Sequence, residues 1–245
     1  MTRDIRASEN KAVQQTLLSS YCPATIKEAR TRQDEILIER YKGGAYKIAD
    51  LGCGDGYHGS IFAPTCDVYH GFEIAPDIAA IAESRWRKAG LHHATVFVGD
   101  AIDAELPDAY YDLVFCLYFT PGNFRDKSED LALYTNAYLD RNPVFIRVMS
   151  KFYGALKPAG RMLLTVYKDV PAAEASQIDF YLHTGQHVVT PRGSRFVMTR
   201  ENFWSVRWTQ ESMLSNLTAV GIAPLQVTFN DLNDIAWLVE ITKPA

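Results

Sequence analysis

Alternating glycines follow an apolar segment near residue 50. The segment Ile48–Leu51 contains Asp50 and leads into Gly52, Gly54 and Gly56. Glycine tolerates positive φ and has no β-carbon, so a turn built this way lets backbone N–H groups approach a ligand closely. The spacing therefore predicts a turn that binds a nucleotide-like cofactor.

A dinucleotide is one candidate for that cofactor. Residues Gly54 to Gly59 satisfy the G-x-G-x-x-G pattern, and Glu73 lies close to the offset of about 20 residues at which an acidic residue binds a ribose. The turn itself begins at Gly52, however. Counted from there, Tyr57 occupies the position of the third small residue that allows helix and strand to pack closely. NAD stays an alternative, but the spacing favours a different nucleoside cofactor.

The pattern Asp50-x-Gly52-x-Gly54-x-Gly56 resembles motif I of the class I S-adenosylmethionine-dependent methyltransferases. Four further segments resemble other motifs of that family, in the right order, across about residues 45–167. They are Gly71–Ala75, Val98–Asp103, Tyr111–Cys116 and the turn and strand Leu156–Leu164, in which Ala159 replaces a glycine. The resemblance implies a doubly wound α/β fold, Rossmann-like, with a mostly parallel seven-stranded sheet and an antiparallel C-terminal hairpin.

The resemblance also implies which residues bind S-adenosylmethionine. Glu73 ends the second strand, where the family's acidic residue accepts hydrogen bonds from both ribose hydroxyls. Asp100 would accept a hydrogen bond from the adenine amine, and Ile102 would pack on the ring. The full set of expected cofactor-binding residues is Asp50, Gly52, Cys53, Gly54, Gly56, Glu73, Ile74, Asp100, Ala101, Ile102 and Leu117.

The residues that follow the fourth expected strand are candidates for binding the methyl acceptor. Thr120–Phe124 resembles an element of some small-molecule N-methyltransferases, including the histidine Nα-methyltransferases, in which the asparagine touches substrate. Asn123 could accept a hydrogen bond from a substrate amine and aim its lone pair at the methyl group. The alternative is a turn in which Asn123 binds its own backbone. The candidate catalytic residues are His58, Tyr118, Asn123 and His183, with His187 a further possible base.

These residues predict a methyltransferase that acts on a small-molecule nucleophile by in-line SN2 displacement. An amine acceptor, and so N-methylation, is one outcome that fits. The alternatives are O-methylation of a small phenol or acid, an NAD-binding Rossmann oxidoreductase, and a catalytically silent nucleoside-binding regulatory domain. The acceptor and the oligomeric state stay open.

Alternating strand and helix patterns must position the motifs. Residues 8–42 are expected to form a helical cap, and residues 168–207 lose periodicity and are expected to form a lid over the substrate. Within that stretch, residues 187–190 and 195–199 could form a hairpin. The other expected elements are strands at 45–51, 68–73, 95–99, 112–118, 161–167, 224–230 and 236–242, with helices at about 77–89, 142–156 and 209–221.

Composition and charge narrow the range of partners and locations that we expect for this protein. The chain of 245 residues has a net charge of −4 with scattered basic residues, which argues against a nucleic-acid partner. Four cysteines without CxxC spacing, no apolar leader and no span of about 20 apolar residues favour a single cytoplasmic domain, 1–245, with no membrane partner. The six histidines show no metal-site spacing, so no metal is expected.

Overall fold

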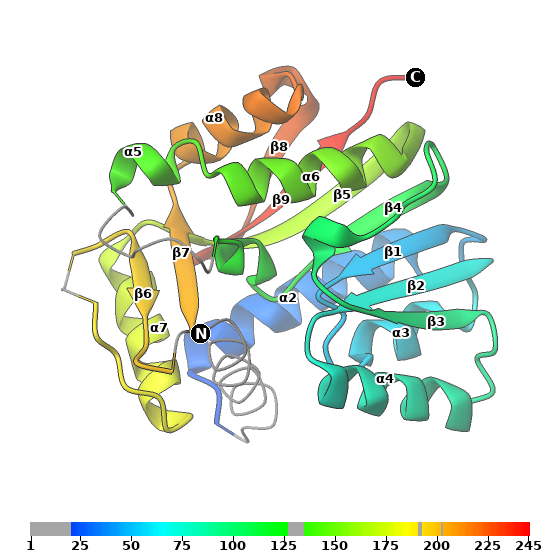
Figure 1. Cartoon of the computed structure of the whole chain (residues 1–245), viewed down its shortest axis with the longest axis horizontal. Coiled ribbons are helices and arrows are strands. Elements are labelled where there is room, and N and C mark those ends of the chain that lie inside the picture. Colours follow the sequence, from blue (N-terminus) through cyan, green and yellow to red (C-terminus); the bar gives the residue numbers. More distant parts are fainter. Residues whose placement is uncertain (1–20, 127–134, 191–192, 202) are drawn as a thin grey trace.

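The structure, a computed structural model, describes residues 21–126, 135–190, 193–201 and 203–245. Its centre is a mixed sheet in which β3, β2, β1, β4 and β5 run parallel in that order, followed by the antiparallel strands β9 and β8 (Figure 1). These strands are β1 (Lys47–Leu51), β2 (Val68–Glu73), β3 (Ala94–Val98), β4 (Tyr111–Cys116), β5 (Leu156–Lys168), β8 (Val227–Asn233) and β9 (Ala236–Thr242). The predicted doubly wound sheet and C-terminal hairpin are confirmed. Within the described residues the sheet has nine strands rather than seven.

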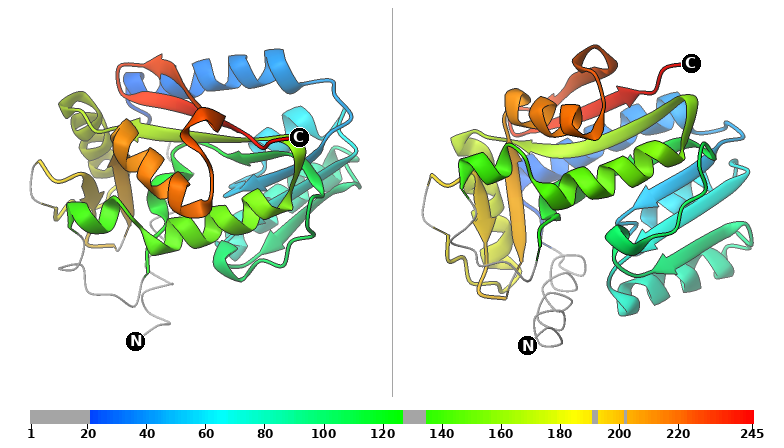
Figure 2. Two further views of the ribbon diagram at one scale, coloured as in Figure 1. Left: turned by 90° about the horizontal axis from the view of Figure 1, so that it is seen from above. Right: turned by 45° about the horizontal axis from the view of Figure 1, so that its top comes forward.

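Helices cover both faces of the sheet. Figure 2 shows α2 on one side of the sheet and α6 and α8 on the other, and α3 and α4 pack under β2 and β3 (Figure 1). Their bounds are α2 (Ala24–Tyr41), α3 (Tyr57–Phe62), α4 (Pro76–Lys88), α5 (Asn136–Leu139), α6 (Pro143–Ala155), α7 (Pro171–His183) and α8 (Gln210–Val220), with short 3-10 helices η1 (Ala101–Asp103), η2 (Thr120–Asn123) and η4 (Pro224–Gln226). Local sequence fixes several ends. Thr209 and Ser212 form a capping box at α8, and Gly221 ends that helix at φ +97°.

Two apolar cores follow from alternation along the strands. In β1, Ile48 belongs to the core under α2, α3 and α4, whereas Ala49 and Leu51 belong to the core under α6 and α8. In β4, Phe115 faces the first core and Val114 the second. Buried strands covered on both faces explain why these segments are apolar almost throughout.

Helix α2 is the described part of the expected N-terminal cap; residues 8–20 of that prediction lie outside the described residues. Its buried side chains recur every three or four residues, which is the spacing of one helix face. They are Ile26, Ala29, Gln33, Leu37 and Tyr41. Gln33 is the polar member of this stripe and is fully buried.

The stretch 168–207 contains regular structure that the sequence does not predict. It begins with the 13-residue helix α7. The buried positions of α7 have helical spacing, but Ser176 and Gln177 are among them, so polar residues on the inner face hide the apolar period. The expected pairing of 187–190 with 195–199 is present in short form, as a bridge between Val188 and Thr199.

Two added strands join this stretch to the main sheet. β6 (Phe196–Met198) pairs antiparallel with β7 (Trp204–Trp208). β7 in turn pairs parallel with the last residues of β5, through Tyr167 and Lys168. At Tyr167 the other edge of β5 is already occupied by β9, so β7 lies on the edge that β4 occupies earlier along β5. The stretch expected as a lid is therefore attached to the sheet at one end of β5, away from β1–β3 (Figure 1).

Candidate active site

A cavity of about 410 Å³ lies at the carboxyl ends of β1, β2, β3 and β4. This is the edge of a parallel α/β sheet at which ligands usually bind, and the volume falls in the usual range of about 300–1,000 Å³ for small-molecule sites. Eleven of the residues singled out in the sequence line it: Gly52, Cys53, Gly54, His58, Glu73, Ile74, Asp100, Ala101, Leu117, Tyr118 and Asn123.

The glycine turn after β1 is shaped by close contacts. Gly52 has φ +74° and Gly54 has φ +55°, both in the left-handed region. A Cβ on Gly52 would lie 2.6 Å from Cγ2 of Thr120, so a side chain there meets the loop after β4. The N–H groups of Gly52 and Cys53 both donate to the carbonyl of Phe72, which ties the turn to β2.

Glu73 links the glycine turn to the end of β2. Its Oε2 accepts from the N–H of Gly54 at 3.0 Å and its Oε1 accepts from the N–H of Ala75 at 2.9 Å. Burial raises the pKa of the Glu73 carboxyl, and those N–H groups oppose the shift. An ionised carboxylate offers about four acceptor positions, so each oxygen keeps one for a ligand hydroxyl.

Asp100 both caps a short helix and lines the cavity. Its Oδ1 accepts from the N–H of Ile102 at 3.1 Å, which caps η1, and its side chain also lines the cavity. The side chain of Ile102 packs against the core under α6 and is not part of the cavity wall.

Three other expected residues also lie outside the cavity wall. Asp50 is fully buried beneath it, and the hydroxyl of Tyr69 donates to its carboxylate at 2.6 Å. Gly56 caps α3, where a Cβ would lie 2.7 Å from Nε1 of Trp86, so packing against α4 requires that glycine. His183 is exposed at the end of α7, where its ring stacks on Tyr21.

The chain bends sharply after β4. Tyr118 and Phe119 have φ +51° and +70°, values that side-chain-bearing residues rarely adopt and that concentrate at functional sites. Phe119 stacks on Tyr167 with ring centroids 3.6 Å apart, whereas Tyr118 lines the cavity. Packing of Phe119 into the core therefore holds the bend that presents Tyr118 to the cavity.

Helix α2 supplies a polar cluster that sequence reasoning missed. Asp34 Oδ1 lies 3.1 Å from Nε2 of His58, and its Oδ2 accepts from the hydroxyl of Tyr118 at 2.6 Å. Gln33 Oε1 accepts from the Tyr118 N–H and from the hydroxyl of Thr165 in β5. The one sequence signal was a glutamine in the middle of the apolar stripe of α2, since a buried amide must find partners.

Asn123 is held by the added strand β7. Its Nδ2 donates to the carbonyl of Trp204 at 2.5 Å, rather than to its own turn. A Cβ on the preceding Gly122 would lie 2.9 Å from the carbonyl oxygen of Val206, so η2 and β7 pack backbone to backbone. With Nδ2 used in this way, the Asn123 side chain retains Oδ1 as the atom that can accept from a ligand.

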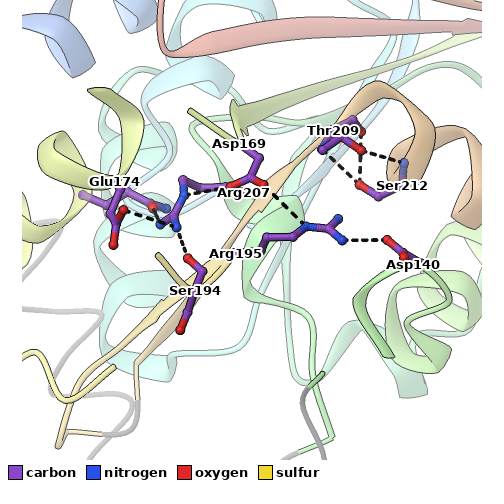
Figure 3. Close-up of polar contacts among 9 residues, drawn as sticks. Asp140, Asp169, Glu174, Ser194, Arg195, Arg207, Thr209 and Ser212 are labelled. Carbon is purple, nitrogen blue, oxygen red and sulfur yellow. Dashed lines mark hydrogen bonds and ion pairs between the residues drawn. The ribbon is translucent and has the colours of Figure 1, made fainter. Parts of the chain in front are cut away.

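Charged contacts hold the stretch 168–207 in place (Figure 3). Arg207 is 2% exposed; its Nη1 donates to Gln177 at 2.9 Å and its Nε to Asp169 at 3.3 Å. Arg195 donates to Asp140 at 2.7 Å and also pairs with Asp169. His187 is exposed and contacts Glu201 at 2.6 Å outside the cavity wall.

None of the helices that the structure describes is long and apolar enough to cross a membrane. The described residues also contain no group of three or more His, Cys, Asp or Glu side chains that could hold a metal ion.

Several known proteins that this chain resembles in sequence or fold are methyltransferases. Residues 48–124 match the family model described as a methyltransferase domain. Over the full chain the fold is similar to the magnesium protoporphyrin IX methyltransferase of Synechocystis (TM-score 0.60, 12% identity, 99% of this chain and 100% of that one). It is also similar to an amino pentose methyltransferase of Micromonospora echinaspora (TM-score 0.52, 18% identity, 89% and 90%). The chain therefore has the fold of these methyltransferases, and residues 48–124 match the methyltransferase-domain family model.

A curated relative matches part of the chain. It is the dTDP-3-amino-3,6-dideoxy-alpha-D-glucopyranose N,N-dimethyltransferase of Streptomyces fradiae, 32% identical over 98 residues. The match spans 40% of this chain and 36% of that protein, so it covers about a third of the relative's length.

Proposed function

We propose that this chain transfers a methyl group from S-adenosylmethionine to an amine of a small molecule. The observation that carries the proposal is the joint placement of the glycine turn, Glu73 and Asp100 on one cavity with Asn123 and Tyr118. The methyltransferase-domain match over residues 48–124 supports the reaction class, and the partial match to an amino-sugar N,N-dimethyltransferase supports nitrogen as the methylated atom.

The residues around the cavity fit this cofactor. Glu73 keeps a free acceptor position on each oxygen, which suits a vicinal diol. Gly52 packs against the side chain of Thr120 with no space for a Cβ, and the turn Gly52–Gly54 lines the cavity, where its backbone can approach a ligand. We assign the nucleoside to Glu73, Ile74, Asp100 and Ala101, and the rest of the cofactor to the turn Gly52–Gly54.

When bound, S-adenosylmethionine supplies a methyl group on a sulfonium. An amine can attack that methyl group in line, and the sulfur then leaves as a thioether. The chain then has to hold the amine and aim its lone pair, and such positioning contributes several kcal/mol to a displacement. We assign that role to Oδ1 of Asn123, which accepts a hydrogen bond from the acceptor's N–H. The aromatic side chains of Phe180, Phe203 and Trp204 line the same cavity and exclude water.

An acceptor that arrives as an ammonium ion has to lose a proton before it can attack. A neutral amine becomes charged when it is methylated and loses a proton afterwards. His58 is the titratable group on the cavity that we assign to this step. His58 Nε2 lies 3.1 Å from Asp34 Oδ1; we assign the ring proton to this nitrogen, which leaves Nδ1 as the acceptor. Tyr118 is not a base here, because burial, and secondly Asp34, raise the pKa of its hydroxyl far above the usual value.

Binding and turnover can be tested separately. In calorimetry with S-adenosylhomocysteine, we expect Glu73→Ala and Gly54→Val each to abolish binding, whereas Glu83→Ala, an exposed acid on α4, has no effect. Circular dichroism of each variant checks that the fold is intact. Unchanged affinity in both site variants would overturn the cofactor assignment, as would thermal stabilisation of the wild type by NADH but not by S-adenosylhomocysteine.

Transfer is then measured with methyl-labelled S-adenosylmethionine on a panel of amines, phenols and carboxylic acids, with products identified by mass spectrometry. Label on an amine nitrogen is the expected result. Label confined to oxygen would replace the N-methylation proposal, and cofactor binding without transfer to any compound would point to a catalytically silent domain.

A further inference from the structure

Charges on the cavity wall are separated by sign. Three acidic side chains lie on the side assigned to the nucleoside: Asp55 follows β1, Glu73 ends β2 and Asp100 follows β3. Two arginines, Arg30 on α2 and Arg125 after η2, lie on the side assigned to the acceptor. Among the described residues of the cavity wall, no acidic side chain lies on α2 or after β4.

The acidic side chains already have partners. Asp55 pairs with Arg85 at 2.7 Å, and Glu73 and Asp100 accept from backbone N–H groups. They therefore do not compete for a cation across the cavity.

Arg30 differs from all of these. Its Nε is buried without a hydrogen-bond acceptor, and among the described residues its guanidinium makes no ion pair. The guanidinium carbon lies 4.7 Å from the ring centroid of Tyr118 and 5.6 Å from that of Phe180. Two aromatic faces hold the cation by cation–π attraction, but they do not satisfy its N–H donors.

A buried, unsatisfied cationic donor is costly unless a ligand supplies the acceptor. The planar fork of a guanidinium matches carboxylate and phosphate oxygens. We propose that the methyl acceptor carries an anionic oxygen group, a carboxylate or a phosphate, and that Arg30 binds it. This inference rests on the function proposed above and adds the substrate class: an amine that bears an oxyanion.

The cofactor also carries a carboxylate, so the two sources must be separated. The neighbours of Arg30 favour the acceptor. The guanidinium contacts the rings of Tyr118, after β4, and Phe180, on α7. Neither ring belongs to the glycine turn after β1. An anion at Arg30 also offsets the two like charges that a guanidinium and a sulfonium would otherwise place in one cavity.

The experiment measures anion binding to protein saturated with S-adenosylhomocysteine. Thermal shift and calorimetry titrate acetate, benzoate, inorganic phosphate and phenyl phosphate, with benzamide as the neutral counterpart of benzoate. We expect at least one anion to bind the wild type, and its affinity to fall by 10-fold or more in Arg30→Gln and by less in Arg30→Lys. Arg32→Gln removes an exposed arginine of the same helix, paired with Glu35, and is expected to leave binding unchanged. The pair of carboxylates and the pair of phosphates show which oxyanion is preferred.

The controls separate this inference from the proposed function. Arg30→Gln should bind S-adenosylhomocysteine and 5′-methylthioadenosine, which lacks the amino-acid carboxylate, as the wild type does. A 10-fold loss for S-adenosylhomocysteine alone would assign Arg30 to the cofactor and overturn the inference, with the methyltransferase proposal intact. Equal anion affinity in wild type and both Arg30 variants, or none in any of them, would overturn it as well. Failure of the wild type to bind S-adenosylhomocysteine would instead contradict the proposed function, and the anion titration on the protein alone would then decide on Arg30. If Arg30→Gln does not fold, Arg30→Lys carries the comparison, because it keeps the charge and removes the fork.

Discussion

The hydroxyl of Tyr118 donates to Asp34 Oδ2 at 2.6 Å and so joins the loop after β4 to helix α2. The same carboxylate contacts His58 through its other oxygen. One acidic residue on helix α2 therefore orients two side chains of the cavity wall that come from distant parts of the sequence.

The first prediction concerns that hydrogen bond. Tyr118→Phe removes the hydroxyl and frees Asp34, so we expect kcat for methyl transfer to fall about 10- to 100-fold through lost positioning. The affinity for S-adenosylhomocysteine should stay within about two-fold, because Glu73 and the glycine turn are untouched. Steady-state kinetics and calorimetry measure the two quantities. An unchanged kcat would show that Asp34 and Tyr118 only stabilise the fold.

The second prediction uses two glycines with nearly equal backbone angles. Gly52 and Gly90 have φ +74° and +72°, but a Cβ would meet a neighbour within 4 Å only at Gly52, where the side chain of Thr120 lies 2.6 Å away. Gly90→Ala should cost about 1–2 kcal/mol of unfolding free energy from the left-handed angle alone. Gly52→Ala should cost more and weaken S-adenosylhomocysteine binding 10-fold or more. Urea unfolding and calorimetry test this, and equal effects of the two substitutions would contradict it.

The third prediction concerns the pH dependence of ligand binding at Glu73. Burial raises the pKa of this carboxyl, and its ionised form is the one that accepts two ligand hydroxyls. Affinity for S-adenosylhomocysteine should therefore fall as the pH drops, with a midpoint above the usual glutamate value of about 4.3. In Glu73→Gln the affinity should be low and free of this transition. Calorimetry between pH 4 and 8 compares the two proteins.

The stability of the free protein should show the opposite sign. Because the folded state holds the Glu73 proton more tightly than the unfolded chain, this group stabilises the fold below its unfolded pKa. That contribution is lost as the pH rises through the folded pKa. Relative to wild type, Glu73→Gln should therefore be more stable at pH 7 than at pH 4. Thermal unfolding at the two pH values measures the difference.

A fourth prediction concerns the buried Arg207. Arg207→Ala leaves Asp169 paired with Arg195 alone and removes the donor to Oε1 of Gln177, and removing one member of a buried pair typically costs about 3–5 kcal/mol. Arg32→Ala, in an exposed pair with Glu35, should change stability by about 1 kcal/mol or less. Chemical denaturation measures both. A small loss for Arg207→Ala would mean that backbone pairing and packing hold β7 on β5 without these side-chain contacts.

Sequence reasoning predicted the parallel sheet well because each buried strand is apolar and each is followed by turn residues. The family resemblance also assigned the glycine turn, Glu73 and Asp100 to one cofactor, and in the structure they line one cavity at the carboxyl ends of neighbouring parallel strands. Sequence reasoning could not find α7, whose inner face carries Ser176 and Gln177, because those side chains have partners only in the folded protein.

The residues on the acceptor side of the cavity were harder to predict than those on the cofactor side, because their roles also depend on contacts made only in the folded protein. Arg30 and Asp34 are two of many charged residues in α2, and their roles depend on which loops pack against this helix. Asp50 and Gly56 differ from these residues, because neither lines the cavity. Both belong to the cofactor motif by sequence, yet their environment is the hydroxyl of Tyr69 for one and the indole of Trp86 for the other.

Strand β5 has a partner on each edge at Tyr167, with β9 on one side and β7 on the other. The N–H of Asp169 continues this pairing by donating to the carbonyl of Trp208 at 2.8 Å. Detaching β7 would therefore break backbone hydrogen bonds of the central sheet. Opening a flap that is attached only through loops would break none of them. The amides of β7 should exchange with solvent as slowly as those of β4, and both halves of the cavity should unfold in one cooperative transition.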